Sequence, residues 1–185
     1  MKLQLPNGQA LHVLNVHLKS KLPTDVPGQK KNAFTWNSAV GWAEGAFLSA
    51  MKRFGQAVEL RLVIDEIFDM EPGALIAVCG DFNAEEHDVE LAAIRSNVEN
   101  HGNEELAGRV MVLCENTVPL SSRYSLFHHG RGAMLDHVLV SRDLLAYYQG
   151  AEIHNEILHD ESIAFATDVK YPESDHAPVV AEFSL

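Results

Sequence analysis

Side chains that can take part in hydrolysis lie beside apolar runs at four places in the sequence. These residues are His17, Asp81, Asn83, Asp136, Asp175 and His176. Taken alone, each has an ordinary explanation: a histidine that ends a strand usually packs or forms a hydrogen bond, and an Asp-x-Asn pair after a glycine usually makes a turn or a helix cap. Found together, they favour a catalytic explanation, because α/β proteins place reactive side chains at the ends of buried strands.

Carboxylates, an amide and imidazoles are the groups that metal-assisted hydrolysis requires. The reaction needs an oriented water molecule, groups that neutralise developing negative charge, and a Lewis acid. Hard divalent cations select oxygen ligands, and aspartate oxygens are ligands of that kind. Residues of these types are compatible with Mg²⁺ or Mn²⁺ as the cofactor.

The runs that carry these residues have the composition of strands. Residues 2–5 alternate, residues 6–9 have turn chemistry and residues 10–18 are apolar and β-branched, which predicts a hairpin. A short apolar run between Gly73 and Gly80 is typical of a buried strand. We expect further strands at residues 110–114, 135–140, 151–158 and 178–183.

The longest helical pattern lies between residues 34 and 70. One apolar stripe at helical spacing consists of Ala57, Leu60, Ile64 and Ile67. Three glycines interrupt the region and favour breaks, so we expect two helices rather than one: Gly41, Gly45 and Gly55. Shorter helices are expected at residues 88–97 and 141–148. Because strands and helices interleave throughout, the predicted class is α/β (α+β layered), in a single domain over residues 1–185.

The net charge of −12 limits the possible partners. An acidic protein repels phosphate at long range, so a bound cation has to reverse the field locally if the substrate is a phosphate ester. The charge argues against tight, salt-driven binding of nucleic acid. No stretch approaches the ~20 apolar residues of a membrane span, and residues 1–8 lack the apolar region of a signal peptide, so we expect a cytoplasmic location by default.

Two motifs resemble the late signature motifs of the endonuclease/exonuclease/phosphatase family. They are Gly-Asp-Phe-Asn at residues 80–83 and Ser-Asp-His-Ala-Pro-Val at residues 174–179. Residues 135–141 resemble the family's Asp-containing strand between them, and residues 15–18 resemble its earlier histidine strand. The resemblance spans residues 9–184 and implies part of a four-layer α/β/β/α sandwich of the deoxyribonuclease-like type.

The resemblance also implies catalytic roles. Asp81 would orient or activate the attacking water, and Asn83 would hold a phosphoryl oxygen. Asp136 would pair with His176 and fix the tautomer of its imidazole. His176 would either stabilise the transferring phosphoryl group or act as the general base.

Two further residues receive roles from the same resemblance. Asp175 would lie at or near the metal. His17 would form a hydrogen bond to a non-bridging oxygen or assist the leaving group. Family branches that resemble pancreatic-type deoxyribonuclease, sphingomyelinase and inositol-polyphosphate phosphatase carry a histidine at this place, whereas abasic-site endonucleases usually do not. Repair at abasic sites is therefore a less favoured function.

The early half of the family's domain has no counterpart in this chain. In the family that half carries an Asn and a Glu that bind the metal, but only 16 residues precede His17 here and none of them is acidic. Three explanations stay open: the chain is a fragment or a truncated gene product, a partner chain supplies the missing half, or the chain self-associates. We expect an exposed apolar sheet face that a second copy, in a homodimer, or a partner chain covers.

The function predicted from these motifs is metal-dependent phosphodiester hydrolysis, with a nuclease-like activity on the backbone of DNA or RNA favoured. One alternative is a phosphatase or phospholipase that acts on small phosphoesters. The other is a non-catalytic, dimerising remnant that kept the late motifs after the metal-binding half was lost.

Overall fold

A mixed five-stranded sheet forms the centre of the molecule. The computed structural model describes the backbone of residues 1–185 and all side chains except those of residues 164–166. In spatial order the strands are β1 (Lys2–Gln4), β2 (Ala10–His17), β5 (Leu75–Asp81), β9 (Asp136–Ser141) and β6 (Met111–Leu113). β2 runs parallel to β5, and the other three pairings are antiparallel.

The remaining elements surround this sheet. The α-helices are α1 (Ala39–Met70), α2 (Val89–Arg95), α3 (Val98–His101), α4 (Arg142–Leu145) and α5 (Glu161–Ala166). The 3₁₀ turns are η1 (Glu104–Arg109), η2 (Cys114–Thr117) and η3 (Leu120–Ser122). Three hairpins pair β3 (Lys30–Asn32) with β4 (Thr35–Trp36), β7 (Leu126–His128) with β8 (Arg131–Ala133), and β10 (Tyr148–Ile153) with β11 (Val179–Phe183). Among the described residues, no helix combines the length and the apolarity that a bilayer span requires.

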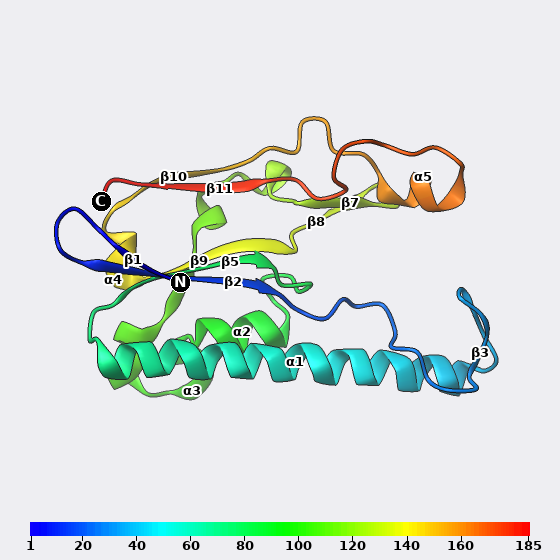
Figure 1. Cartoon of the computed structure of the whole chain (residues 1–185), viewed down its shortest axis with the longest axis horizontal. Coiled ribbons are helices and arrows are strands. Elements are labelled where there is room, and N and C mark those ends of the chain that lie inside the picture. The colour runs from blue at the N-terminus through cyan, green and yellow to red at the C-terminus, as the bar shows by residue number, and fades with distance from the viewer.

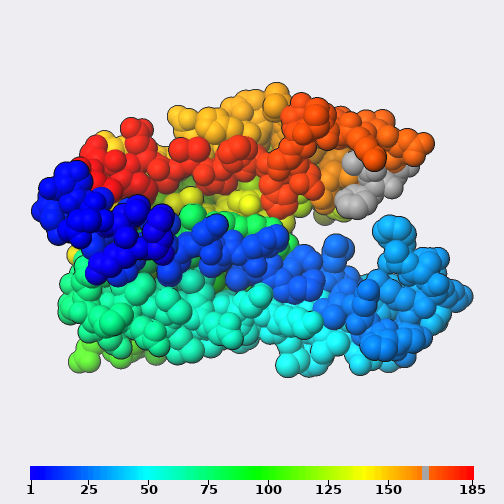
Figure 2. Space-filling view, viewed as in Figure 1, coloured from blue at the N-terminus to red at the C-terminus, as the bar shows by residue number. Residues whose placement is uncertain are grey.

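Three layers result, with α1 and α2 on one face of the central sheet and the β10–β11 hairpin on the other (Figure 1). Alternation along β5 explains both contacts, since Ile76 and Val78 pack toward the helices while Leu75 and Ala77 pack toward the hairpin. In the space-filling view the C-terminal segments lie along the top and α1 along the bottom, with the N-terminal hairpin between them (Figure 2). The layered α/β class predicted from the sequence is confirmed.

The prediction of two helices between residues 34 and 70 is wrong, because α1 is one continuous helix of 32 residues. Ser38 caps its first turn by accepting a hydrogen bond from the backbone N–H of Gly41 at 3.0 Å. A Cβ at Gly41 would lie 2.5 Å from the side-chain oxygen of Gln29, and a Cβ at Gly45 would lie 2.5 Å from the carbonyl oxygen of Thr24. These glycines therefore let a loop pack closely on the helix and do not break it.

The exposed apolar surface lies on α1 and not on a sheet. Both faces of the middle strands β5 and β9 are covered within the chain, whereas β1 at the edge is exposed. The exposed positions of the β10–β11 hairpin are mostly polar: Gln149, Glu152, Val180 and Glu182. Along α1, exposed apolar side chains recur every three, four or seven residues on the side opposite the core. This outer stripe of α1 consists of Val40, Phe47, Met51, Phe54, Val58 and Leu62. We expected from the sequence an exposed apolar sheet face, but the exposed apolar stripe lies on α1.

Candidate active site

Three of the predicted residues form a row across adjacent strands. His17 at the end of β2 is the register partner of Asp81 at the end of β5, and Asp81 is the register partner of Asp136 at the start of β9. β2 and β5 are parallel and end together, while β9 runs the opposite way and begins where they end. Register partners point to the same face of a sheet, so the three side chains project toward the hairpin side at one edge.

The backbone around Asp81 requires two specific residues. Gly80 has φ +134°, and a Cβ at this position would overlap the carbonyl oxygen of Val16 on the neighbouring strand. Asn83 has φ 48°, in the left-handed region that asparagine tolerates better than most residues. Its backbone N–H donates to Oδ1 of Asp81 at 2.8 Å, and its side-chain amide donates to Oδ2 of Asp81 at 2.9 Å and to the carbonyl of Leu18 at 3.0 Å.

The side-chain donors of Asn83 are thus occupied inside the protein, and the residue orients the carboxylate of Asp81. Its predicted contact with a phosphoryl oxygen stays a prediction, since that contact would require the amide to give up one of these bonds. Asn83 is buried and Asp81 is partly buried, so the loop that joins them is held firmly at the strand end.

His176 reaches this row from the segment that precedes β11. Its Nδ1 lies 2.6 Å from Oδ2 of Asp136, which is the pairing that the resemblance implied. The hydrogen bond that His176 donates to Asp136 is the main cause that raises the pKa of His176 to about 9, against the opposing effect of burial, and the charges of Asp136, Asp81 and Asp175 add to it. The imidazole therefore carries two protons at neutral pH in the chain without a bound cation.

Ser125 joins the segments that carry Asp136 and His176, and no sequence pattern pointed to it. Its hydroxyl accepts hydrogen bonds from the backbone N–H groups of Leu135 and Asp136 at 3.1 and 3.0 Å. Its backbone carbonyl accepts from the N–H of Ala177 at 2.8 Å. The side chain is fully buried. A lone serine before a short strand has no pattern that would distinguish it from a turn residue.

A buried ion pair supports the loop behind Asp81. Nδ1 of His137 contacts the carboxylate of Glu115, and its Nε2 lies 2.8 Å from the carbonyl oxygen of Ala84. Both side chains are only 1% exposed. Acceptors face both ring nitrogens, so the imidazole has to donate twice and carries a positive charge. Glu115 was not recognised from the sequence because it lies in an irregular segment far along the chain from residues 81–84.

His17 lies at the outer margin of the row. Its Nε2 is 3.4 Å from Oδ2 of Asp81, and its side chain is 77% exposed. The imidazole is therefore open to solvent and to a ligand while staying within reach of the central carboxylate. This position fits a group that meets substrate, and its role stays a prediction.

Asp81, Asp136 and His176 offer ligand atoms that all lie within 4.8 Å of one another. Among the described residues, these three form the one group of potential ligands that lie close enough together to hold a metal ion. Two carboxylates suit a hard cation such as Mg²⁺ or Mn²⁺, whereas Nδ1 of His176 is already engaged with Asp136. Asp175 is exposed and lies outside this group, so its predicted role as a ligand is not established.

No protein-family model matches the sequence, and no curated protein matches it either. Solved structures do resemble it. The 3′–5′ exonuclease NExo from Neisseria meningitidis matches with a TM-score of 0.55 and 19% identity over 100% of this chain and 64% of that one. A variant of NExo from Neisseria, described as a 3′ phosphatase bound to product DNA hairpin, matches with a TM-score of 0.53 and 21% identity over 96% and 62% of the two chains.

An AP endonuclease from Archaeoglobus fulgidus matches with a TM-score of 0.51 and 13% identity over 100% of this chain and 64% of that one. At these identities the likeness shows the fold. The chain spans less than two thirds of the length of each of these three proteins.

Proposed function

We propose, from the deoxyribonuclease-like fold that this chain shares with endonuclease/exonuclease/phosphatase enzymes, that it belongs to their family and hydrolyses phosphodiesters with Mg²⁺ or Mn²⁺. One observation carries the proposal: the strand register and the return of the chain before β11 bring Asp81, Asp136 and His176 within 4.8 Å of one another. Four separate motifs of the sequence contribute to this edge, and hydrolytic chemistry needs all of their residue types.

The carboxylates of Asp81 and Asp136 would hold the cation, with Asp175 as a further candidate ligand. When bound, the cation supplies a Lewis acid and offsets the negative charge that this acidic protein would otherwise present to a phosphate. Asp81 would orient the attacking water, because Asn83 fixes its carboxylate at the centre of the row.

His176 would donate a proton in a hydrogen bond to a non-bridging phosphoryl oxygen. Asp136 accepts from Nδ1, which leaves Nε2 as the ring nitrogen that can face a ligand. In the chain without a bound cation the pKa of His176 is raised to about 9, which fits a donating role, because a general base has to be unprotonated at the working pH. His17, exposed beside Asp81, would contact a second oxygen of the same phosphate or the leaving group.

A nuclease is the favoured form of this activity. NExo is described in complex with a product DNA hairpin, and the open, exposed setting of His17 would admit a polymer as readily as a small ester. A phosphatase or phospholipase that acts on small phosphoesters would use the same residues and is the alternative.

Hydrolysis of bis(p-nitrophenyl) phosphate, with Mg²⁺, with Mn²⁺ and with EDTA, tests the proposal. We expect turnover that requires the cation and that falls to background in Asp136→Asn and His176→Ala. Glu182→Gln, on the outer side of β11, is the matched control and should leave the rate unchanged. Parallel assays on plasmid DNA and on p-nitrophenyl phosphate separate a nuclease from a phosphatase. Absence of cation-dependent turnover on all three would favour the non-catalytic remnant.

A second copy or a partner chain would contact α1. The side chains of the outer stripe other than Met51 would form this contact, at the spacing of residues that pack between helices. Sedimentation velocity should therefore show a dimer, and Phe47→Glu together with Phe54→Glu should return it to a monomer. A wild-type chain that sediments as a monomer at all concentrations would contradict this part of the proposal.

A further inference from the structure

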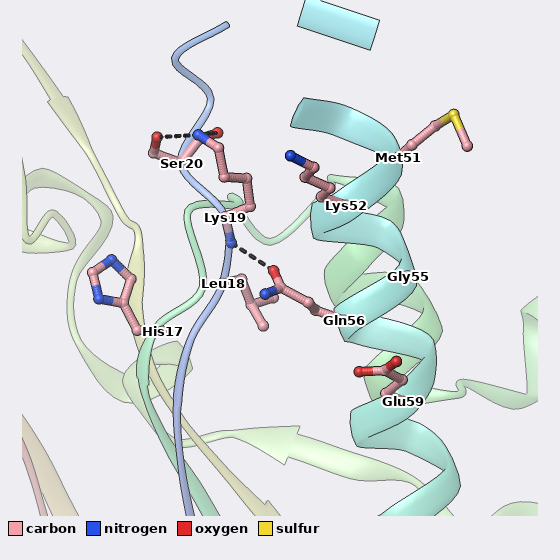
Figure 3. A pocket seen from close by; sticks show the side chains of 9 residues that line it. All are labelled: His17, Leu18, Lys19, Ser20, Met51, Lys52, Gly55, Gln56 and Glu59. Carbon is pink, nitrogen blue, oxygen red and sulfur yellow. Dashed lines mark hydrogen bonds between the residues drawn. The ribbon is translucent and has the colours of Figure 1, made fainter. Parts of the chain in front are cut away.

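A groove of about 690 Å³ begins at His17 and runs along α1. One wall is the segment that leaves β2, including Lys19 and Ser20, and the other is the middle of α1, including Met51 and Lys52. Figure 3 shows the two lysines together at one end of the groove and His17 on the far side of the β2 segment from α1. A chain-like ligand bound at the row of catalytic residues, on the hairpin side, would enter this groove by passing around the end of β2 at residues 17–20.

Both lysines carry charge that no carboxylate neutralises within the described part of the chain. The ammonium of Lys19 donates only to neutral oxygens, on Ser20 and Leu22, and Lys52 forms no ion pair. Their neighbours differ, since Lys21 pairs with Asp88 and Arg53 with Glu90. Burial, and then the charges of Lys52 and Arg53, lower the pKa of Lys19. In a chain of net charge −12, a pair of uncompensated cations is a specific feature that an anion would stabilise.

The face of α1 that lines the groove lacks a side chain at one position, Gly55. Gly55 lines the groove in the middle of α1, and a Cβ built there meets nothing within 4 Å. Packing therefore does not explain this glycine, although glycine inside a helix costs about 1 kcal/mol relative to alanine. A large side chain at this position would extend into the groove beside Lys52.

We propose that this lysine groove, formed by Lys19, Ser20, Met51, Lys52 and Gly55, binds a nucleic-acid strand on one side of the phosphate that is cleaved. A backbone phosphate lies beside the ammonium of Lys52, and the ammonium of Lys19, held by Ser20 and Leu22, adds positive charge nearby. This inference rests on the proposed phosphodiesterase function, which it deepens by assigning a polymeric substrate. Glu59 lies at the opposite end of the groove, so the phosphate binds at the lysine end.

The apolar part of the wall favours a nucleotide strand over a plain polyphosphate. Met51 is 56% exposed and lines the groove directly beside Lys52. A polarizable thioether contacts the flat face of a base well, whereas a linear polyphosphate offers it nothing. Cations for the backbone beside an apolar surface for bases are the combination by which proteins hold single strands.

Binding of a fluorescein-labelled oligothymidylate of about 12 nucleotides, followed by anisotropy in EDTA over a series of salt concentrations, tests the groove. Lys52→Gln should weaken binding several-fold at low salt and make the slope of log K against log salt shallower by about 0.7, the value for one phosphate contact on a single strand. Lys31→Gln makes the same change in net charge at an exposed site outside the groove and should leave the slope unchanged.

Gly55→Leu should fill the groove and weaken binding, while Gly55→Ala should retain binding and raise the urea midpoint of unfolding. Equal binding by Lys52→Gln and Lys31→Gln, or full binding by a folded Gly55→Leu, would overturn the proposal. Displacement of the oligonucleotide by tripolyphosphate at equal phosphate concentration would overturn the assignment to nucleic acid. Because these measurements need no turnover, their failure is distinct from that of the phosphodiesterase, which hydrolysis of the small ester tests by itself.

Discussion

The imidazole of His176 and the carboxylate of Asp136 are joined by a contact of 2.6 Å, although 40 residues separate them in the chain. Asp136 opens β9 and His176 precedes β11, so two different sheets supply the pair. Ser125 joins their backbones, accepting from the N–H of Asp136 through its hydroxyl and from the N–H of Ala177 through its carbonyl. The pair is thus held by main-chain hydrogen bonds as well as by its own attraction.

The first prediction concerns the proton on His176. In the chain without divalent cations, its pKa should be about 9, because the hydrogen bond to Asp136 holds the charged form against the cost of burial. Asp136→Asn should bring it back toward the ordinary value of about 6.5. NMR titration of the imidazole resonances measures both. A wild-type value at or below the ordinary one would contradict the donating role proposed for this residue.

The same shift has a consequence for stability. A histidine whose pKa is raised on folding stabilises the native state fully below its unfolded pKa of about 6.5, and that contribution is lost as the pH rises through about 9. The free energy of unfolding of the wild type should therefore decline across this window relative to that of Asp136→Asn. Urea titrations at several pH values provide the comparison.

The second prediction concerns the buried pair of Glu115 and His137. Removal of the carboxylate charge in Glu115→Gln leaves a buried imidazolium without its partner, which should cost about 3–5 kcal/mol of unfolding free energy. Glu86→Gln is the matched control, because its carboxylate is more exposed and pairs with Arg95 nearer the surface, so the loss should stay below about 1 kcal/mol. Equal losses in urea denaturation would show that the buried pair does not hold the loop.

The third prediction concerns Gly80. Gly80→Ala would place a methyl group against the carbonyl oxygen of Val16 at a φ of +134°, a backbone region that alanine avoids. Strain of this kind costs on the order of 1–3 kcal/mol, and the overlap with a neighbouring strand adds to it. Gly55→Ala, which has open space and helical backbone, should instead stabilise the fold. A Gly80→Ala protein as stable as the wild type in urea would refute the close approach of β2 and β5.

The fourth prediction separates two effects of Asn83. Asn83→Gly keeps the left-handed backbone but removes the amide that holds Asp81, so cation-dependent turnover should fall about a hundredfold, as expected when a reacting group is misplaced. Asn83→Ala should lose the same activity and in addition about 1–2 kcal/mol of stability, because alanine resists a φ of 48°. Turnover that survives in Asn83→Gly would show that the amide does not position the carboxylate.

Much of the fold follows from local sequence patterns. The hairpin of β1 and β2, the buried strand β5 and the strand β9 were all predicted, since each is an apolar run bounded by turn residues or glycine. The helix α1 was divided wrongly because a helical glycine reads as a break when its packing partners are unknown. Gly41 and Gly45 are explained by Gln29 and Thr24, which the chain brings to the helix only on folding.

The residues of the candidate site were recognisable by type, and a resemblance to one family predicted that they form one catalytic site. The residues that support them were not. Ser125, Glu115 and His137 act through contacts with segments that are 10 to 53 residues away, and no local periodicity marks such contacts. The groove beside Lys52 was equally hidden, because it depends on which face of α1 lies against the end of β2.

The sequence by itself determined which chemistry this chain can offer: carboxylates, an amide and imidazoles, each beside an apolar run that has to become a strand. The tertiary structure decided that they meet. The parallel pairing of β2 with β5 and the antiparallel pairing of β5 with β9 put His17, Asp81 and Asp136 in one row. The physical reason is that strand register is set by packing on both faces of the sheet and by long connections, which local composition does not encode.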